Sequence, residues 1–311
     1  MSLSTFRPPP PVVPNTLLSL PSPHVLLVTL NRPRQLNAIP TAQHAAMAAL
    51  WAWYDAQPQL RCAVLTGSGR AFCAGADLRE WDADHNHHHR QSGSTTTTTS
   101  DGGSTSSTTR GAHGDEADGE AEAKRAWVRD GGFGGLSNRT GKKPVVAAVN
   151  GLCFGGGMEM VVNCDLVVAD GQHARFGLPE VTRGVIALAG ALPRLVRTVG
   201  RQRAAEMALL GRTEYTAREM REWGLVNFVV GEGEAVAEAV RLAAEVAGNS
   251  PDAVIVSREG LRLGWEAMGP ELGTEVLGKG MYGRMDGGEN MKEGVRSFVE
   301  RRKPVWKDSK L

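Results

Sequence analysis

The sequence lacks a surplus of charge of either sign, and it has few aromatic residues. Its 311 residues include 35 Lys and Arg against 34 Asp and Glu, and Phe, Trp and Tyr together make up 5%. Balanced charge argues against a polyanionic partner, and scarce aromatic side chains argue against a surface that stacks nucleic-acid bases. We therefore expect no nucleic-acid partner. No run of 18 apolar residues occurs, so we expect no membrane span either.

Cysteine is equally scarce, and its spacing excludes the usual metal and redox motifs. No two of the four cysteines form a CxxC pair, and all lie in apolar stretches, which predicts buried, reduced thiols at Cys62, Cys73, Cys153 and Cys164. A histidine cluster at 85–89 lies in a low-complexity stretch, where we expect adventitious metal affinity at most. The sequence therefore predicts no metal site.

Motifs for phosphate-bearing cofactors are missing as well. There is no GxxxxGK[ST], and a GxGxxG motif starting at Gly151 fails because Cys153 occupies the second glycine position. A dinucleotide or P-loop cofactor is thus disfavoured. What the chain does have is glycine beside an acid: the stretch GLCFGGGMEM at 151–160 follows the apolar run VVAAV and contains Glu159.

Strand and helix patterns alternate along the chain. Residues 24–31, 60–67, 143–151 and 164–170 have the apolar patterns of strands, and residues 40–57 have apolar positions at helical spacing. Such alternation predicts an α/β core with parallel strand pairing. Active sites in cores of this kind tend to lie at the carboxyl ends of the strands.

The two ends and one internal stretch differ from this core in composition. We expect an extended proline-rich leader at 1–23, and a core at 24–230 that is interrupted by a disordered low-complexity insertion at 83–125. The amphipathic helical pattern in residues 231–306 predicts a helical subdomain or an oligomerisation arm. The tail at 307–311 ends in Ser-Lys-Leu, a receptor-read peroxisomal address, which predicts a peroxisomal location and the import receptor as a partner.

Two small-residue loops and two glutamates are the candidate catalytic groups. A glycine turn that opens a helix leaves backbone N–H groups free to bind negative charge on oxygen, and residues 155–157 fit this role. The loop RAFCAGADL at 70–78 offers a second approachable backbone, although either loop alone could be an ordinary turn. Glu159 and Glu180 would supply the base and acid of general acid–base catalysis, although each alone could be a surface or capping glutamate.

Several stretches occur together in the order and spacing of a known protein family. The chain resembles the enoyl-CoA hydratase/isomerase (crotonase) family in NRPRQLNAI (31–39), AFCAGADL (71–78), NGLCFGGGMEM (150–160), CDLVVAD (164–170) and ARFGLPEV (174–181). The resemblance covers about residues 24–306 apart from the insertion. It implies a crotonase-like spiral of ββα repeats, with a C-terminal helical region that packs homotrimers or dimers of trimers.

The resemblance also implies the catalytic groups and the substrate class. The substrates would be acyl-CoA thioesters, with no metal and no cofactor beyond the coenzyme A of the substrate. The backbone N–H groups of Ala74 and Gly156 would hold the thioester oxygen, and Glu159 and Glu180 would be the two catalytic glutamates.

The same resemblance assigns the residues that bind coenzyme A. The loop after the second strand would line this site, with Ala74, Gly75, Ala76 and Asp77. Arg34 would either meet the coenzyme A phosphates or lie free in solvent.

Hydration of trans-2-enoyl-CoA, as in fatty acid β-oxidation, is the activity that we predict. Glu159 would act as the base toward water, and protonated Glu180 would deliver hydrogen to C2 of the acyl group. The alternatives are a Δ3,Δ2-enoyl-CoA isomerase, which needs one carboxylate, another crotonase-type reaction on a CoA ester, and a non-catalytic acyl-CoA binder. ALAGALPRL at 187–195 departs from the Pro–Gly-rich run common in the family, so the sequence leaves the acyl chain length open.

Overall fold

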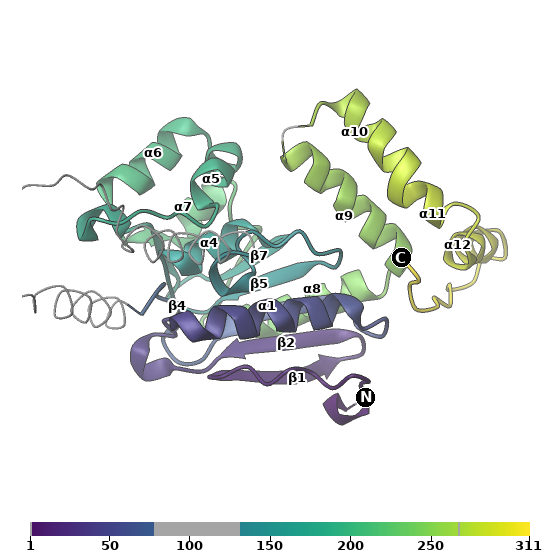
Figure 1. The fold of residues 1–311 in the computed structure, drawn as a ribbon, viewed down its shortest axis with the longest axis horizontal. Helices are drawn as coiled ribbons and strands as arrows, with labels where there is room; N and C mark the ends of the chain where they lie inside the picture. Colours follow the sequence, from purple (N-terminus) through teal and green to yellow (C-terminus); the bar gives the residue numbers. More distant parts are fainter. Residues whose placement is uncertain (1, 78–130, 267) are drawn as a thin grey trace, which may run out of the picture.

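The computed structural model describes residues 2–77, 131–266 and 268–311 (Figure 1). The insertion predicted at 83–125 and its histidine cluster lie outside the described residues. The remaining chain forms an α/β body, and a group of C-terminal helices projects from one side of it.

Within the described residues, the larger sheet has six strands in the order β1-β2-β3-β5-β7-β10. β1 pairs antiparallel with β2, and all other neighbours pair parallel. The strands are β1 (Thr16–Ser22), β2 (Val25–Leu30), β3 (Cys62–Gly67), β5 (Val145–Val149), β7 (Leu166–Asp170) and β10 (Phe228–Val230). The four predicted strands and their parallel pairing are thus confirmed, with shorter bounds.

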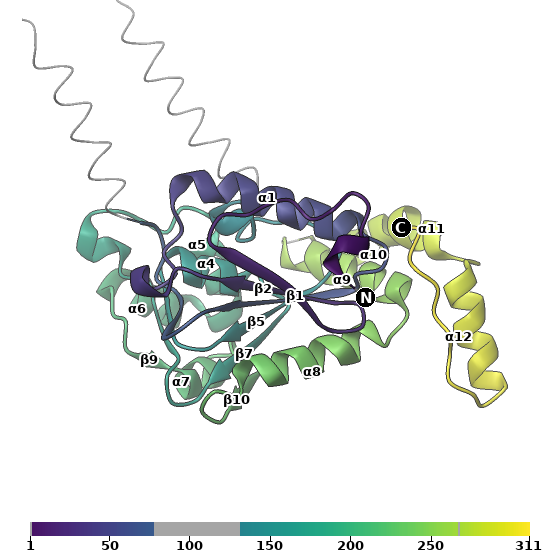
Figure 2. The ribbon, with the colours of Figure 1, turned by 90° about the horizontal axis from the view of Figure 1, so that it is seen from below.

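The central strands are buried on both faces, which explains their unbroken apolar runs. Along β5, Ala147 packs into the core beneath α1 (Thr41–Ala56), whereas Val146 and Ala148 pack into the core beneath α8 (Ala235–Ala247). Figure 2 shows these two helices on opposite sides of the sheet. Alternating side chains therefore fill two separate cores, one on each face.

A second, smaller sheet carries the elements that build the site. Its four strands have the order β4-β6-β8-β9, and the first three, β4 (Ala71–Cys73), β6 (Leu152–Phe154) and β8 (Arg175–Gly177), pair parallel; β9 (Tyr215–Thr216) closes the sheet antiparallel. Each of β3, β5 and β7 of the large sheet is followed directly by one of these short strands. The chain thus winds as a spiral in which each turn supplies one strand to each sheet, as the resemblance implies.

The helices that follow the small sheet complete the body. The strand β6 leads into α4 (Gly156–Val162), and β8 leads into the 3-10 turn η4 (Glu180–Arg183). The remaining helices of this part are α5 (Ala191–Val199), α6 (Arg201–Leu210) and α7 (Ala217–Glu222).

The N-terminal residues are part of the fold, which corrects the prediction of a leader at 1–23. Residues 16–22 form the edge strand β1. Ahead of it, Phe6 and Val13 are buried, and the ring of Phe6 packs edge-on against Trp53 with 5.3 Å between ring centroids. The strand was not predicted, because the prolines suggested that the whole segment is extended and separate from the core. The strand begins at Thr16, after the prolines at 8–11 and 14.

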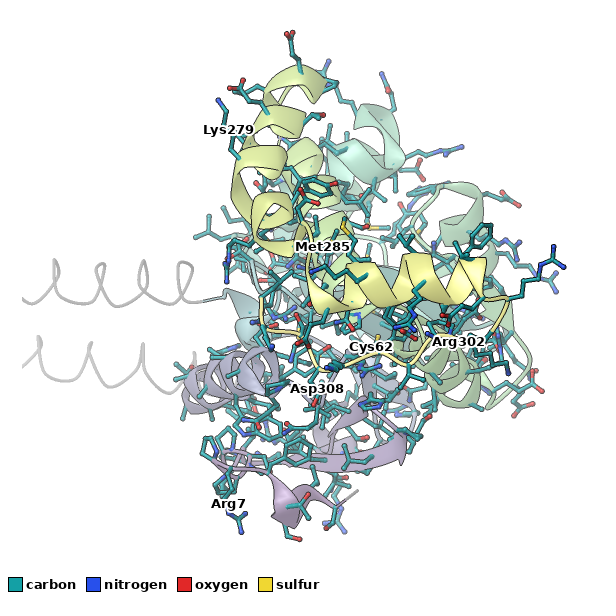
Figure 3. The ribbon with its side chains drawn as sticks, turned by 90° about the vertical axis from the view of Figure 1, so that its right-hand side faces the viewer. Arg7, Cys62, Lys279, Met285, Arg302 and Asp308 are labelled. Carbon is teal, nitrogen blue, oxygen red and sulfur yellow. The ribbon has the colours of Figure 1, made fainter. Side chains whose placement is uncertain are left out.

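The C-terminal region is helical, as predicted. It contains α9 (Pro251–Trp265), α10 (Pro270–Leu277), the π-turn η5 (Gly278–Tyr282), α11 (Gly283–Met285) and α12 (Glu289–Val299). Figure 3 shows the last residues returning along α12, from Arg302 to Asp308. Helix α12 carries the exposed apolar side chains Val295, Phe298 and Val299. None of the helices in the described part of the chain is long and apolar enough to span a membrane.

Candidate active site

Three loops emerge side by side from the small sheet, because β4, β6 and β8 run parallel and end at the same edge. The loop after β4 contains Ala74–Asp77, the turn after β6 contains the three glycines and leads to Glu159, and the segment after β8 leads to Glu180. All the predicted catalytic groups therefore lie at one edge of the sheet. This edge corresponds to the carboxyl-end location that sequence patterns predicted.

The glycine turn can exist only with glycine at its first two positions. Gly155 has φ +55°, a left-handed conformation that costs glycine little. At Gly156 a Cβ would lie 2.4 Å from the ring of Phe133, so no side chain fits there. Gly156 is the first residue of α4, and its N–H donates to no acceptor within the described residues. A free amide at the start of a helix is suited to bind developing negative charge on oxygen.

The prediction that the Ala74 N–H is the second donor to the thioester oxygen is wrong. Its N–H donates to the carbonyl oxygen of Leu36 at 3.0 Å, so it is not available to a substrate. The free donor in this loop is two residues further on. Ile39 pairs with the neighbours of Ala76, accepting from Asp77 and donating to Gly75, which turns the Ala76 N–H to the opposite side. In the part of the chain that the structure describes, the Ala76 N–H has no acceptor.

Ala76 and Gly156 belong to loops that touch each other. Gly75, with φ +99°, lies against the glycine turn: a Cβ added to it would be 3.3 Å from the Gly156 nitrogen and 3.2 Å from the Phe154 oxygen. The two free N–H groups thus come from two segments that follow separate strands of the small sheet, and Gly75 brings these segments into contact. This is the arrangement of a two-donor oxyanion hole.

Glu159 is buried in the first turn of α4, with 4% of its surface exposed. Its Oε1 accepts a hydrogen bond of 2.9 Å from the backbone N–H of Ala189. The pKa of Glu159 is raised from its ordinary value of 4.5 to about 7, mainly by burial and also by the nearby Glu180, against the lowering effect of the backbone donors and of Arg194. Such a carboxyl can both take and give a proton near neutral pH.

Glu180 begins the turn η4 and faces the glycine turn. Its Oε1 lies 3.1 Å from the position that a Cβ on Gly155 would occupy. Its Oε2 is buried and has no hydrogen-bond partner within the described residues. Burial also raises the pKa of Glu180. Glu159 lies in the first turn of the helix that this glycine turn begins, so the two carboxyls flank the same turn, and the charge of Glu180 raises the pKa of Glu159.

The other residues predicted to bind coenzyme A differ in whether their side chains are available to a ligand. Arg34 is exposed in the 3-10 turn η2 (Pro33–Gln35), which leads to the residue that accepts the Ala74 N–H. Asp77 forms an ion pair with Arg32 at 3.0 Å, so its charge is already balanced. Gly75 and Ala76 line the loop itself. The backbone of this loop, rather than the Asp77 carboxylate, is therefore what the site offers.

Sequence reasoning missed several residues that shape the site. Asn37 is buried and donates to the carbonyls of Ser68 and Ala71, which fixes the segment that pairs with the loop after β4. Ala189 holds Glu159, and Phe133 packs against the glycine turn. Only Ala189 had a signal, because the small-residue run at 187–195 stood out as unusual; the others have partners far away in sequence.

Comparison with known proteins agrees with this geometry. The family description enoyl-CoA hydratase/isomerase matches residues 25–100 and 112–309. The solved structure of an enoyl-CoA hydratase from Mycobacterium tuberculosis H37Rv is similar, with a TM-score of 0.75 and 29% identity over 95% of this chain and 100% of that one. This chain belongs to the enoyl-CoA hydratase/isomerase family, and the two free amides and two carboxyls at the edge of its small sheet are the kinds of group that acid–base chemistry on a thioester requires.

Two relatives make the class more specific. The chain is 56% identical to the mevalonyl-coenzyme A hydratase SIDH of Beauveria bassiana, over 99% of this chain and 100% of that protein. It is 46% identical to the mevalonyl-coenzyme A hydratase sidH of Aspergillus fumigatus, over 97% and 98% of the two chains. The chain is therefore a hydratase, a lyase that acts on an acyl-CoA thioester.

Proposed function

We propose that this hydratase interconverts mevalonyl-CoA and the enoyl thioester formed by loss of water from it. The observation that carries the proposal is the 56% identity with the Beauveria bassiana protein across 99% of this chain. Mevalonyl-CoA replaces the straight-chain trans-2-enoyl-CoA of β-oxidation that we expected from the sequence. The motifs behind that expectation are shared across the family, so they cannot distinguish one acyl group from another.

In this proposal the thioester oxygen binds to two backbone N–H groups, those of Ala76 and Gly156. In either direction of the reaction a thioester enolate forms, and its negative charge lies largely on this oxygen. Removing one such donor from an oxyanion hole typically costs about 10²–10³-fold in rate. Both amides are free and come from loops in contact, which supports this assignment in place of the one with Ala74.

The two carboxyls divide the proton transfers. In the dehydration direction, Glu180 takes the proton from C2, and protonated Glu159 gives its proton to the hydroxyl that leaves C3 as water. In the hydration direction Glu159 takes a proton from water, which attacks C3, and Glu180 returns a proton to C2. The pKa of Glu159, raised to about 7, supports a group that can be protonated near neutral pH, and burial also raises the pKa of Glu180.

An isomerase needs one carboxylate to move a proton between C4 and C2. The pairing of Glu159 with Glu180 disfavours that reaction, since the second group would have no part in it. A non-catalytic binder would likewise leave two partly or fully desolvated carboxyls with no role that offsets the cost of desolvating them.

The proposal is tested by offering the purified protein three thioesters. With mevalonyl-CoA we expect the ultraviolet absorbance of a conjugated enoyl thioester to appear, with kcat/KM at least about 100-fold above that for hydration of crotonyl-CoA. A 3-enoyl-CoA should give no conjugated product. Equal or faster turnover of crotonyl-CoA would contradict the proposed substrate, and turnover of the 3-enoyl thioester alone would make the protein an isomerase.

We also propose that the chain assembles as a homotrimer or a dimer of trimers through its C-terminal helices. Exposed apolar side chains on α12 support this, with 86% of Phe298, 73% of Val299 and 64% of Val295 accessible in the single chain. Contiguous apolar surface of this kind marks interaction sites more often than free surface.

A peroxisomal location is proposed from the last three residues, Ser309-Lys310-Leu311. In the folded chain Ser309 is hydrogen-bonded to Asp252, and Lys142 contacts the carbonyl of Leu311, so these contacts must open before a receptor can bind the tripeptide. Deleting Leu311 from a fusion with an N-terminal fluorescent protein should move the signal from peroxisomal puncta to the cytosol. Puncta that persist without Leu311 would show that a different signal directs the protein.

A further inference from the structure

One buried hydroxyl, outside the groups assigned to catalysis, connects both halves of the site. Ser137 is completely buried, and its Oγ donates a hydrogen bond of 2.7 Å to the carbonyl of Ala189. The same oxygen accepts a hydrogen bond of 2.7 Å from the N–H of Phe133. Its donor and one of its acceptor positions are therefore both used, and both partners are themselves site residues.

Each of these partners controls one catalytic element. Ala189 uses its own N–H to hold the Glu159 carboxyl at 2.9 Å, so the Ser137 hydroxyl, by holding the Ala189 carbonyl, restrains the residue that donates this hydrogen bond. Phe133 packs its ring where a Cβ of Gly156 would be, at 2.4 Å, and so lies against the amide that begins α4. A displacement of Ser137 would therefore be expected to shift both the Glu159 carboxyl and the Gly156 N–H.

Arg194, on α5, holds the same segment from the other side. Its Nη1 donates to the carbonyl of Ser137 at 2.8 Å, to Oδ1 of Asn138 at 2.6 Å and to the carbonyl of Gly190 at 3.4 Å. Its Nη2 forms an ion pair of 3.4 Å with Glu266, just after α9. The guanidinium thus ties the Ser137 segment to the residue that follows Ala189.

We infer that Ser137 and Arg194 form a clamp that positions Glu159 for proton transfer, with Ser137 as the central positioning residue. The inference rests on the proposed function, because it concerns the reaction assigned to this site. Neither residue touches the reacting atoms in it. The clamp acts through Ala189, whose N–H must point at the Glu159 carboxylate whenever that group gives up its proton.

The substitution Ser137→Ala removes the hydroxyl and, with it, the hydrogen bond to the Ala189 carbonyl and the hydrogen bond from the Phe133 N–H. We expect kcat to fall about 10–100-fold, the loss typical of misplacement by an ångström or less, while KM stays within about twofold. We also expect the pKa of Glu159 to rise, because a weaker Ala189 hydrogen bond stabilises the charged form less. The charged groups that act on Glu159, namely Glu180 and Arg194, are unchanged in this variant.

Two readouts separate positioning from mere stability. The first is kcat and KM with mevalonyl-CoA. The second is the pKa of Glu159 in the folded protein, obtained as the pH at which the stability difference between each protein and its Glu159→Gln counterpart stops growing. The matched control is Ser297→Ala: Ser297 is also buried and donates to a backbone carbonyl, that of Gly294, but it lies in α12. This control should lower stability without moving either readout.

The outcomes are distinct. A lower kcat and a Glu159 pKa raised by roughly half a unit or more in Ser137→Ala, absent in the control, would support the clamp. A folded Ser137→Ala protein with unchanged kcat and unchanged pKa would overturn it, as would an equal loss of kcat in the control. If Ser137→Ala does not fold, Arg194→Lys decides in the same way, because lysine keeps the charge but cannot reproduce the contacts of the guanidinium. Should the wild-type protein turn over no thioester, the proposed function fails, yet the pKa readout still tests the clamp.

Discussion

Replacing Glu180 with glutamine is expected to lower kcat by about 10²–10⁴-fold, the usual contribution of a positioned acid–base group. Glutamine keeps the size of the side chain but cannot exchange a proton with C2. KM should change little, because the oxyanion hole and the coenzyme A contacts stay intact. Steady-state kinetics with mevalonyl-CoA measures both constants.

The structure explains why so large an effect follows from one atom. The Oε2 of Glu180 is buried without a hydrogen-bond partner in the described part of the chain, so the protein keeps a desolvated proton acceptor next to the glycine turn. The control is Glu222→Gln, since Glu222 is exposed on α7 and should be dispensable. A Glu180→Gln enzyme that keeps more than about a tenth of wild-type kcat would remove this residue from the proton transfer.

Replacing Glu159 with glutamine is expected to abolish turnover to a similar degree while making the protein more stable. Burial raises the pKa of Glu159 from 4.5 to about 7, so above that pH the folded protein holds a buried, ionised carboxylate that the unfolded chain would expose to water. The cost of that charge is absent below pH ~4.5, grows up to pH ~7 and then stays constant. Glutamine removes it and still offers an oxygen to the Ala189 N–H.

The expected gain in the free energy of unfolding reaches about 3 kcal/mol at and above neutral pH, at ~1.4 kcal/mol for each pH unit of raised pKa. Denaturant unfolding of both proteins at several pH values between 4 and 8 measures it. The signature is the pH dependence: the two proteins should be about equally stable near pH 4.5 and diverge as the pH rises. A difference that does not vary with pH would mean that Glu159 ionises normally in the folded state.

How far sequence reasoning reached depended on how local each feature is. The glycine turn and Glu159 occupy neighbouring positions on one element, so their relation could be predicted from the spacing alone. The free amide of the other loop could not, because it depends on which residues Ile39 pairs with across the loop. Backbone hydrogen bonding alternates in direction along an extended segment, and the pairing with Ile39 makes Ala76 the free donor while Leu36 occupies the N–H of Ala74.

The two sheets show the same limit. Apolar runs predicted the four neighbouring strands β2, β3, β5 and β7 of the large sheet, because the side chains of these strands fill the cores on both of its faces. The short strands β4, β6 and β8 carry the site, yet each has only three residues, too few for a period to be recognised. Ser137 lies outside the recognised motifs, and its importance follows only from the partners that the fold brings to it.

The N-terminal strand protects an edge of the large sheet, which bears on how far the chain can be shortened. β1 covers the outer edge of β2, and the segment before it shields Trp53, whose indole N–H is bonded to the carbonyl of Pro8. A chain shortened to the recognised family motifs would lack β1, and β2 would become an exposed edge strand. Its unpaired backbone groups could then pair with a strand from another molecule. Pro21 lies within β1 itself and has no N–H to donate to a further strand, so it limits growth of the sheet beyond β1.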